Sequence, residues 1–173
     1  MSAANHVSLP PSPWVTRWSA EIPRPGTVLD LACGAGRHAR WLHAQGFDVA
    51  AVDRDIAAFG TPPPGVALLQ ADLEAGPWPY PGRRFAGIVV TNYLHRPLFP
   101  VLLEALAPEG VLIYETFAAG NERFGNPSNP DFLLNPGELL DVVAGQLRVL
   151  AYEDLQIDTP KPAIIQRICT RKR

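Results

Sequence analysis

Residues 28–40 read Val28-Leu-Asp30-Leu-Ala32-Cys-Gly34-Ala-Gly36-Arg-His-Ala-Arg40, an apolar run that ends in two closely spaced glycines. This pattern predicts a β-strand that turns tightly on Gly34 and Gly36 into a helix. A second apolar run, residues 47–52, predicts a neighbouring strand and ends in Asp53. A helix start offers free N–H groups, glycines let the backbone approach a ligand, and Asp53 can accept hydrogen bonds from both hydroxyls of a ribose. The stretch therefore indicates a nucleoside-containing cofactor.

The identity of that nucleoside depends on Asp30. Gly34, Gly36 and Ala39 also fit the G-x-G-x-x-A pattern of nicotinamide-dinucleotide folds. However, Asp30 lies four residues before Gly34, where its negative charge would repel a diphosphate and attract a cationic ligand. S-adenosylmethionine carries an ammonium and a sulfonium group and has no phosphate. The stretch therefore favours S-adenosylmethionine, and a nicotinamide dehydrogenase is the less favoured alternative.

At these residues the chain resembles the class I S-adenosylmethionine-dependent methyltransferases, whose D-x-[AG]-x-G-x-G motif is matched by Asp30, Ala32, Gly34 and Gly36. Many members of that family carry glycine where this chain has Ala32. The short chain and the Gly-Arg-His-Ala helix start are most similar to the small bacterial methyltransferases of the tellurite-resistance and thiopurine group. The resemblance implies a Rossmann-like α/β fold with seven strands, mostly parallel, an antiparallel C-terminal hairpin and helices on both faces.

Strand and helix signals alternate along the chain, which independently predicts a parallel sheet covered by helices. We expect one domain over residues 1–173, with residues 1–24 as an N-terminal extension that holds a short helix at 14–20. Helices are also expected from residue 37 to 45, after Pro97, and from Asn135, as N-cap, to Gly145. The expected strands are 28–32, 47–52, 66–70, 85–91, 111–116, 147–153 and 163–169.

Composition limits the classes of function. A formal net charge of −2 provides no basic surface for indiscriminate nucleic-acid binding. Two cysteines are too few for a disulfide framework, and Cys33 is expected to pack behind the cofactor loop. No signal peptide is recognised, and no apolar run approaches the roughly 18 residues that a membrane span needs. We therefore expect a cytoplasmic protein without a membrane partner.

The resemblance implies which residues hold the cofactor. Asp53 would bind the ribose, with Arg54 near the adenine, and Asp72 and the backbone of Leu73 would bind the adenine ring. Asp30 would lie near the methionine ammonium, directly or through the loop backbone. The complete expected set is Trp14, Asp30, Ala32, Gly34, Gly36, Asp53, Arg54, Asp72, Leu73 and Asn92.

Four of these assignments have a structural alternative. Asp53 could cap a helix, Asp72 could form a turn, and Trp14 could pack in the core instead of covering the amino-acid end of the cofactor with Arg17. Asp30 could cap the loop that follows it.

The acceptor is expected beside the end of the fourth strand, at Asn92-Tyr93-Leu94-His95. Asn92 is followed by Tyr-Leu instead of the Pro-Pro of many amino-methylating enzymes, which disfavours that chemistry. Tyr93, His95 and Glu115 are the catalytic candidates, since histidine has a pKa suited to a general base near neutrality. His95 could instead cap a helix or lie at the surface. Tyr114 is also expected to face this pocket.

Residues 117–135 contain glycine, asparagine and proline without periodicity, and loops longer than about 12–15 residues are commonly lids or binding loops. We expect this loop to face the substrate. The histidines are scattered along the chain, and no metal site is predicted. The sequence thus predicts methyl transfer to a small molecule. An RNA or protein methyltransferase and a non-catalytic S-adenosylmethionine-binding protein are the alternatives.

Overall fold

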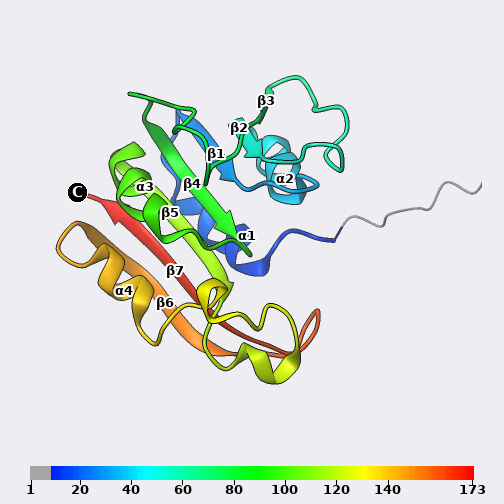
Figure 1. Cartoon of the computed structure of the whole chain (residues 1–173). Coiled ribbons are helices and arrows are strands. Elements are labelled where there is room, and N and C mark those ends of the chain that lie inside the picture. Colours follow the sequence, from blue (N-terminus) through cyan, green and yellow to red (C-terminus); the bar gives the residue numbers. More distant parts are fainter. Residues whose placement is uncertain (1–8) are drawn as a thin grey trace, which may run out of the picture.

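A computed structural model describes residues 9–173 of the chain (Figure 1). The α-helices are α1 (Pro13–Trp18), α2 (Arg37–Ala44), α3 (Phe99–Ala105) and α4 (Glu138–Val143). Short 3₁₀ helices are η1 (Ser19–Glu21), η2 (Arg96–Leu98), η3 (Asn121–Phe124) and η4 (Pro130–Phe132). The strands are β1 (Thr27–Leu31), β2 (Asp48–Asp53), β3 (Val66–Gln70), β4 (Phe85–Thr91), β5 (Leu106–Phe117), β6 (Leu147–Ile157) and β7 (Ala163–Lys172).

The strands form one seven-stranded sheet in the order β3-β2-β1-β4-β5-β7-β6. The pairs from β3 to β5 are parallel, whereas β7 runs antiparallel to both β5 and β6. This confirms the predicted mostly parallel sheet with an antiparallel C-terminal hairpin. Strand order reverses between β1 and β4, and ligands of open α/β sheets bind in the crevice at the carboxyl ends of strands on either side of such a reversal.

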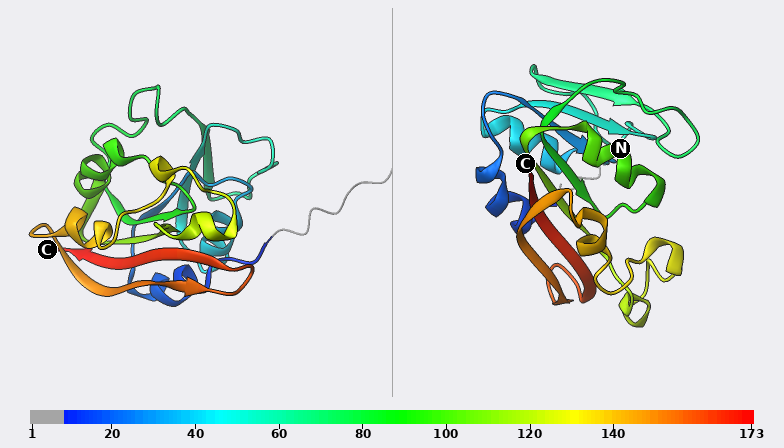
Figure 2. Two further views of the ribbon diagram at one scale, coloured as in Figure 1. Left: turned by 60° about the horizontal axis from the view of Figure 1, so that its bottom comes forward. Right: turned by 90° about the vertical axis from the view of Figure 1, so that its left-hand side faces the viewer.

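Successive side chains of a strand point to opposite faces of the sheet, and in the central strands both sets of side chains are buried. In β5, Leu112 and Tyr114 join the core beneath α3 and α4, while Val111 and Ile113 join the core beneath α1 and α2. Figure 2 shows these helices as two layers, one on each side of the sheet. The predicted two-sided helix cover is therefore confirmed.

The proline-rich segment of residues 77–81 is a loop, as its sequence predicts, but it is not wholly at the surface. Tyr80 is only 8% exposed and stacks edge-on against Phe85 with ring centroids 5.3 Å apart. Trp78 packs partly buried against the same core. No helix connects β3 to β4, so these aromatic rings cover the sheet where a helix would otherwise lie.

Two predicted boundaries also need correction. Helix α4 begins at Glu138, not just after Asn135, because Gly137 has a left-handed backbone with φ 71°. Asn135 still takes part in the helix start, since its N–H donates to Glu138 Oε2 at 2.7 Å. Strand β5 begins at Leu106 and not at residue 111, so residues 108–110 lie within the strand, beside a register shift against β4. Within residues 9–173, no helix has the length and apolar character needed to cross a membrane.

Candidate active site

Strands β1 and β4 are each followed by a residue with left-handed backbone. Ala32 follows β1 with φ 54°, and Asn92 follows β4 with φ 53°. Leu31 and Val90 are register partners, so Ala32 and Asn92, which lie just beyond them, are near one another where strand order reverses. Left-handed backbone strains a residue with a side chain, and such strain concentrates at functional sites. The strain at Ala32 also explains why glycine suits that position in the motif.

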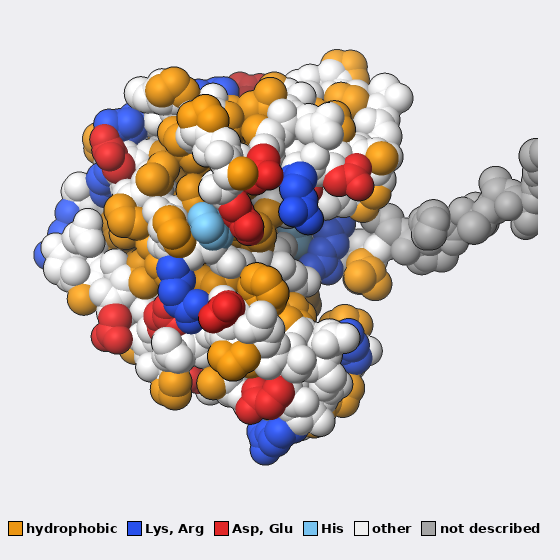
Figure 3. All heavy atoms as spheres, viewed as in Figure 1, with side chains coloured by type: hydrophobic (Ala, Val, Ile, Leu, Met, Phe, Trp, Pro, Cys, Tyr) orange, Lys and Arg blue, Asp and Glu red, His pale blue; other side chains and the backbone are white. Residues whose placement is uncertain are grey.

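A hollow of about 180 Å³ lies against these strand ends. Its walls come from the ends of β1 and β2, from the segment after β3 and from the segment after β4. Figure 3 shows acidic side chains on this face, beside basic side chains and a histidine. The lining residues are Ala32, Asp53, Arg54, Ala71, Asp72, Leu73, Glu74 and Tyr93.

The two loop glycines face different surroundings. A Cβ on Gly34, where φ is 54°, would have no heavy atom within 4 Å. A Cβ on Gly36, where φ is 83°, would lie 2.3 Å from Phe59 Cε2. Gly34 thus leaves open space beside the backbone, whereas Gly36 lets the Phe59 ring pack against the loop.

Asp53 connects β2 to the glycine loop. Its Oδ2 accepts a hydrogen bond from the Gly34 N–H at 2.8 Å, and its Oδ1 accepts one from the Asp55 N–H at 3.0 Å. No helix follows β2, so Asp53 is not a helix cap. A carboxylate has about four lone-pair positions, so Asp53 retains capacity to accept ribose hydroxyls.

Asp72 does form a turn, as its structural alternative proposed, and it also lines the hollow. Its Oδ1 accepts hydrogen bonds from the N–H groups of Ala75 and Glu74, and these bonds lower the pKa of the Asp72 carboxyl. Arg54 and His95 lie close enough to lower that pKa further by their charge. Within the described chain, no hydrogen bond uses the backbone N–H of Leu73. That donor is therefore available to a ligand.

Asp30 does not face the hollow directly. It is 1% exposed, and its Oδ2 accepts a hydrogen bond from the Ala39 N–H in the first turn of α2 at 2.9 Å. Burial raises the pKa of Asp30 to about 7, against smaller lowering effects of the Ala39 bond and the Arg37 charge. Asp30 therefore holds the helix start in place, and of its two predicted routes to the ammonium only the one through the loop backbone fits this geometry.

Trp14 lies in the core and does not cover the hollow, which corrects its assignment to the cofactor. It is 3% exposed, its Nε1–H donates to the carbonyl of Ile168 in β7, and the Arg167 guanidinium lies 4.7 Å from its ring centroid. Arg17 is exposed, with its guanidinium 4.9 Å from the Trp18 ring. Trp14 thus holds α1 against β7, whereas Arg17 contacts its own helix.

Tyr93 lines the hollow, and His95 lies close enough to Asp72 for its charge to act on that carboxyl. The Tyr93 hydroxyl donates to Glu74 Oε1 at 3.3 Å, and burial followed by the Glu74 charge raises its pKa. Tyr93 is therefore protonated at neutral pH. His95 is half-buried, precedes η2, and makes no side-chain cap hydrogen bond there. Tyr114 is fully buried, and its hydroxyl donates to the Tyr93 carbonyl at 2.7 Å, so it supports the strand end without facing the pocket.

Glu115 does not line the hollow, contrary to prediction. Its Oε1 accepts a hydrogen bond from the Ser12 hydroxyl at 2.7 Å, and its Oε2 lies 3.2 Å from Arg167 Nη1. Both carboxylate oxygens are therefore engaged within the protein. Glu115 anchors the N-terminal segment to β5 and lacks the free carboxylate that a catalytic base needs.

Sequence reasoning missed a buried polar group around His38. The His38 ring is 2% exposed, its Nε2 lies 3.0 Å from the Ser12 N–H, and its Nδ1 lies 3.3 Å from Thr91 Oγ1. The Pro10 carbonyl accepts a hydrogen bond from Arg37 Nη1 at 2.9 Å. The N-terminal segment is thus bound to the start of α2. The one local signal was that His38 follows the glycine loop, because its partners lie elsewhere in the chain.

The loop of residues 117–135 follows β5, which ends beside β4, and projects from that end of the sheet (Figure 1). Arg96 binds it firmly: Nη1 donates to the Asp131 carbonyl at 3.0 Å, and Nη2 donates to the Leu133 carbonyl at 2.9 Å. The same guanidinium pairs with Glu138. Phe124 and Phe132 are 42% and 52% exposed. The loop is therefore held in place by Arg96 and exposes two aromatic rings to solvent.

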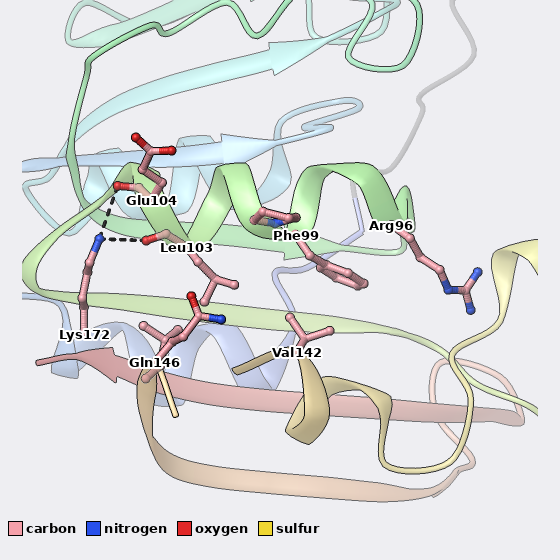
Figure 4. Close-up of a pocket in the computed structure, with 9 residues that line it drawn as sticks. Arg96, Phe99, Leu103, Glu104, Val142, Gln146 and Lys172 are labelled. Carbon is pink, nitrogen blue, oxygen red and sulfur yellow. Dashed lines mark hydrogen bonds between the residues drawn. The ribbon is translucent and has the colours of Figure 1, made fainter. Parts of the chain in front are cut away.

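A larger cavity of about 650 Å³ lies elsewhere, between α3 and α4 (Figure 4). Figure 4 shows Lys172 at one end and Arg96 at the other. Lys172 Nζ donates to the carbonyls of Leu103, Glu104 and Leu106, and Arg96 is engaged as described above. Because both cations are bound by protein acceptors, this cavity offers a ligand no free cation, and the smaller hollow has the better chemistry for a site. Residues 9–173 contain no group of three or more histidine, cysteine, aspartate or glutamate side chains placed to hold a metal ion.

Known proteins share this fold. A family model described as "Methyltransferase domain" matches residues 4–142. TehB from Haemophilus influenzae superimposes with a TM-score of 0.71 at 20% identity, over 90% of this chain and 60% of that one. An S-adenosylmethionine-dependent methyltransferase from Methanosarcina mazei superimposes with a TM-score of 0.68 at 14% identity, over 95% of this chain and 99% of that one.

A third solved structure is 1,6-didemethyltoxoflavin-N1-methyltransferase from Burkholderia thailandensis, with bound 1,6-didemethyltoxoflavin and S-adenosylhomocysteine. It has a TM-score of 0.64 at 19% identity, over 92% of this chain and 76% of that one. No curated protein matches the chain in sequence. These structural likenesses confirm the fold, and the family model covers well over half of the chain. The chain therefore belongs to the methyltransferase-domain family.

Proposed function

We propose that this protein transfers a methyl group from S-adenosylmethionine to a small-molecule acceptor. The observation that carries the proposal is the hollow at the reversal of strand order, where Asp53 and Asp72 follow successive parallel strands. Carboxylates suit a donor that carries two positive charges and has ribose hydroxyls and an adenine amino group to donate hydrogen bonds. A diphosphate would find several carboxylates in the same place.

Within this proposal, each wall of the hollow binds one part of the donor. Asp53 accepts hydrogen bonds from the ribose, while the free N–H of Leu73 and the carboxylate of Asp72 recognise the adenine edge. Arg54 lies over the same wall, and Ala32, Gly34, Gly36 and Asn92 bring backbone close to the ligand. Asp30 acts through the loop that it anchors to α2.

S-adenosylmethionine supplies an already activated methyl group, so the protein mainly has to position the acceptor in line with the S–CH₃ bond. Positioning of this kind can lower a barrier by roughly 7–11 kcal/mol. His95 is the group we propose as general base where the acceptor carries a proton, since it lies near Asp72 at the rim of the hollow. The protonated Tyr93 hydroxyl can orient an acceptor but cannot remove its proton.

A small acceptor suits the surface of this protein. The net charge of −2 offers no basic face for RNA, and the Burkholderia thailandensis enzyme of the same fold holds 1,6-didemethyltoxoflavin. We propose that the acceptor lies between the end of β4 and the loop of residues 117–135. Transfer of a labelled methyl group to RNA or protein, but to no small molecule, would contradict this part of the proposal.

The cofactor assignment is tested by ligand binding. S-adenosylhomocysteine should raise the melting temperature, whereas NAD should not, because NAD brings a diphosphate to an acidic hollow. The variant Asp53→Ala should bind S-adenosylhomocysteine about 10- to 100-fold more weakly, since a hydrogen bond to a charged group contributes about 1.5–3 kcal/mol. Asp48→Ala, at the exposed opposite end of β2, is the matched control and should bind normally. Stabilisation by NAD alone would overturn the proposal.

A further inference from the structure

The buried His38 ring has a defined proton position. Its Nε2 lies 3.0 Å from the backbone N–H of Ser12, and a backbone N–H can only donate a hydrogen bond. Nε2 must therefore accept, and it carries no proton. Burial, with a smaller effect of the Arg37 charge, lowers the pKa of His38 to about 3, so the ring is neutral. A neutral imidazole carries one proton, which here must lie on Nδ1.

This proton position determines the direction of the Thr91 hydroxyl. The Nδ1–H of His38 donates to Thr91 Oγ1 at 3.3 Å, so the hydroxyl hydrogen of Thr91 cannot point toward His38. No acceptor for that hydrogen exists among the described residues. Thr91 is half-buried and immediately precedes the left-handed Asn92. The end of β4 therefore presents a hydrogen-bond donor that no described group satisfies.

One positive charge near this donor favours an anionic partner. Arg37 lies close enough for its charge to act on His38. The negative charge of Glu115 is opposed by Arg167, which also pairs with Glu153. Thr91 does not line the hollow proposed for the adenosine, whereas Tyr93, two residues further along, does. The amino-acid part of the donor would then extend along the end of β4 toward Thr91.

We propose that the Thr91 hydroxyl donates a hydrogen bond to the carboxylate of the methionine part of S-adenosylmethionine, and that His38 is a positioning residue that aims it. The proposal rests on the proposed function of the site. Ser12 completes the arrangement from the N-terminal segment, because its N–H determines which nitrogen of His38 carries the proton.

The test compares two ligands that differ in the amino-acid part. Calorimetric titration would use S-adenosylhomocysteine, which has the carboxylate, and 5′-methylthioadenosine, which lacks it. Thr91→Val should weaken S-adenosylhomocysteine about tenfold and leave 5′-methylthioadenosine within about twofold of the wild type. Thr91→Ser, which keeps the hydroxyl, should restore binding. If the unliganded Thr91→Val variant shows no thermal unfolding transition, and therefore does not fold, Thr91→Ala is used in its place.

Variants of His38 test the positioning role. His38→Ala should lower the affinity ratio of the two ligands in the same direction as Thr91→Val, while His38→Asn, which retains a donor near the Nδ1 position, should largely preserve it. An equal loss for both ligands in Thr91→Val would mean that Thr91 only supports the fold. If Thr91→Val bound both ligands as the wild type does, the Thr91 hydroxyl would not donate to the donor's carboxylate, and the assignment would be overturned. Failure of the wild-type protein to bind S-adenosylhomocysteine would instead overturn the proposed function, and this inference with it.

Discussion

Gly34 and Gly36 lie two residues apart in the loop after β1, yet their lack of a side chain serves different purposes. At Gly36 the space for a Cβ is filled by the ring of Phe59. The backbone carbonyl of Phe59 also accepts a hydrogen bond from Arg40 Nη2 at 2.6 Å. At Gly34 the space is open. One glycine is therefore required by packing, and the other leaves room on the side where we place the ligand.

The two glycines should respond differently to alanine. Gly36→Ala should destabilise the unliganded protein by about 3 kcal/mol or more, because left-handed strain adds to the clash with Phe59. Gly34→Ala should cost only the backbone strain, about 1–2 kcal/mol. Denaturant unfolding without ligand measures both. An equal loss in the two variants would show that the Phe59 contact contributes nothing.

Asp30 should make the stability of the protein depend on pH. Its folded pKa of about 7 lies above the ordinary value of 3.8, so the folded state binds a proton that the unfolded state releases. The stability that this group contributes is therefore fully present below the unfolded pKa, is lost as pH rises through the folded pKa, and changes no further above it. Asp30→Asn carries no charge, so it should be a few kcal/mol more stable than the wild type at about pH 8, with no such advantage below about pH 4.

Thermal unfolding across this range measures the effect. Asp48→Asn, at an exposed position, is the control and should show no pH-dependent difference. A wild-type protein as stable as Asp30→Asn at alkaline pH would mean that the Asp30 carboxylate is adequately satisfied in its buried position.

At the scale of elements, the loop of residues 117–135 depends on Arg96. The Arg96 guanidinium forms a bidentate ion pair with Glu138, with Nε 2.6 Å from Oε1 and Nη2 3.0 Å from Oε2. The Asn121 side chain adds a second anchor, since it donates to the Pro127 carbonyl and accepts from the Ile164 N–H of β7. A structureless sequence thus forms an ordered loop because side chains satisfy its backbone groups.

Loss of the Glu138 charge should loosen this loop before the rest of the protein. Burial raises the pKa of Glu138, but hydrogen bonds from Arg96 and Asn135 outweigh it, so the pKa lies below the ordinary 4.5. Its stabilising effect is therefore present above about pH 4.5 and is lost as pH falls through the folded pKa. Glu138→Gln should reduce the hydrogen-exchange protection of residues 117–135 at neutral pH, whereas the wild type should lose this protection only in acid.

The control is the Arg84–Glu104 pair, which has a 3.7 Å separation and side chains that are 45% and 77% exposed. Glu104→Gln should leave exchange of the loop unchanged, because exposed ion pairs contribute little. Unaltered exchange in Glu138→Gln would show that Asn121 alone suffices to hold the loop.

At the scale of the whole molecule, the sheet order places β1, β4 and β5 in the centre and β3 and β6 at the edges. The burial of β4 is complete up to its last residue, whereas β3 is largely exposed. Central strands open only with the whole domain, while edges open locally. Native-state hydrogen exchange should therefore be slowest in β1 and β4 and clearly faster in β3. Equal protection of β3 and β4 would contradict this order of stability.

The sequence alone was sufficient where the signal is local. The apolar runs of β3 and β4 predict their bounds as observed. Of the residues expected at the cofactor, Ala32, Asp53, Arg54, Asp72 and Leu73 line the hollow, whereas Gly34 and Gly36 do not. Periodicity and turn chemistry act over a few residues, so they can be recognised without knowledge of the rest of the chain.

The tertiary structure alone decided which polar side chains are free. Glu115 is paired because Ser12, 103 residues away, reaches it, and Trp14 is buried because its N–H finds a carbonyl 154 residues away. His38 is aimed at Thr91 because Ser12 lies on its other side. Contacts of this separation leave no periodic trace in the sequence, since each partner is a common residue whose pairing depends on how the sheet brings distant segments together.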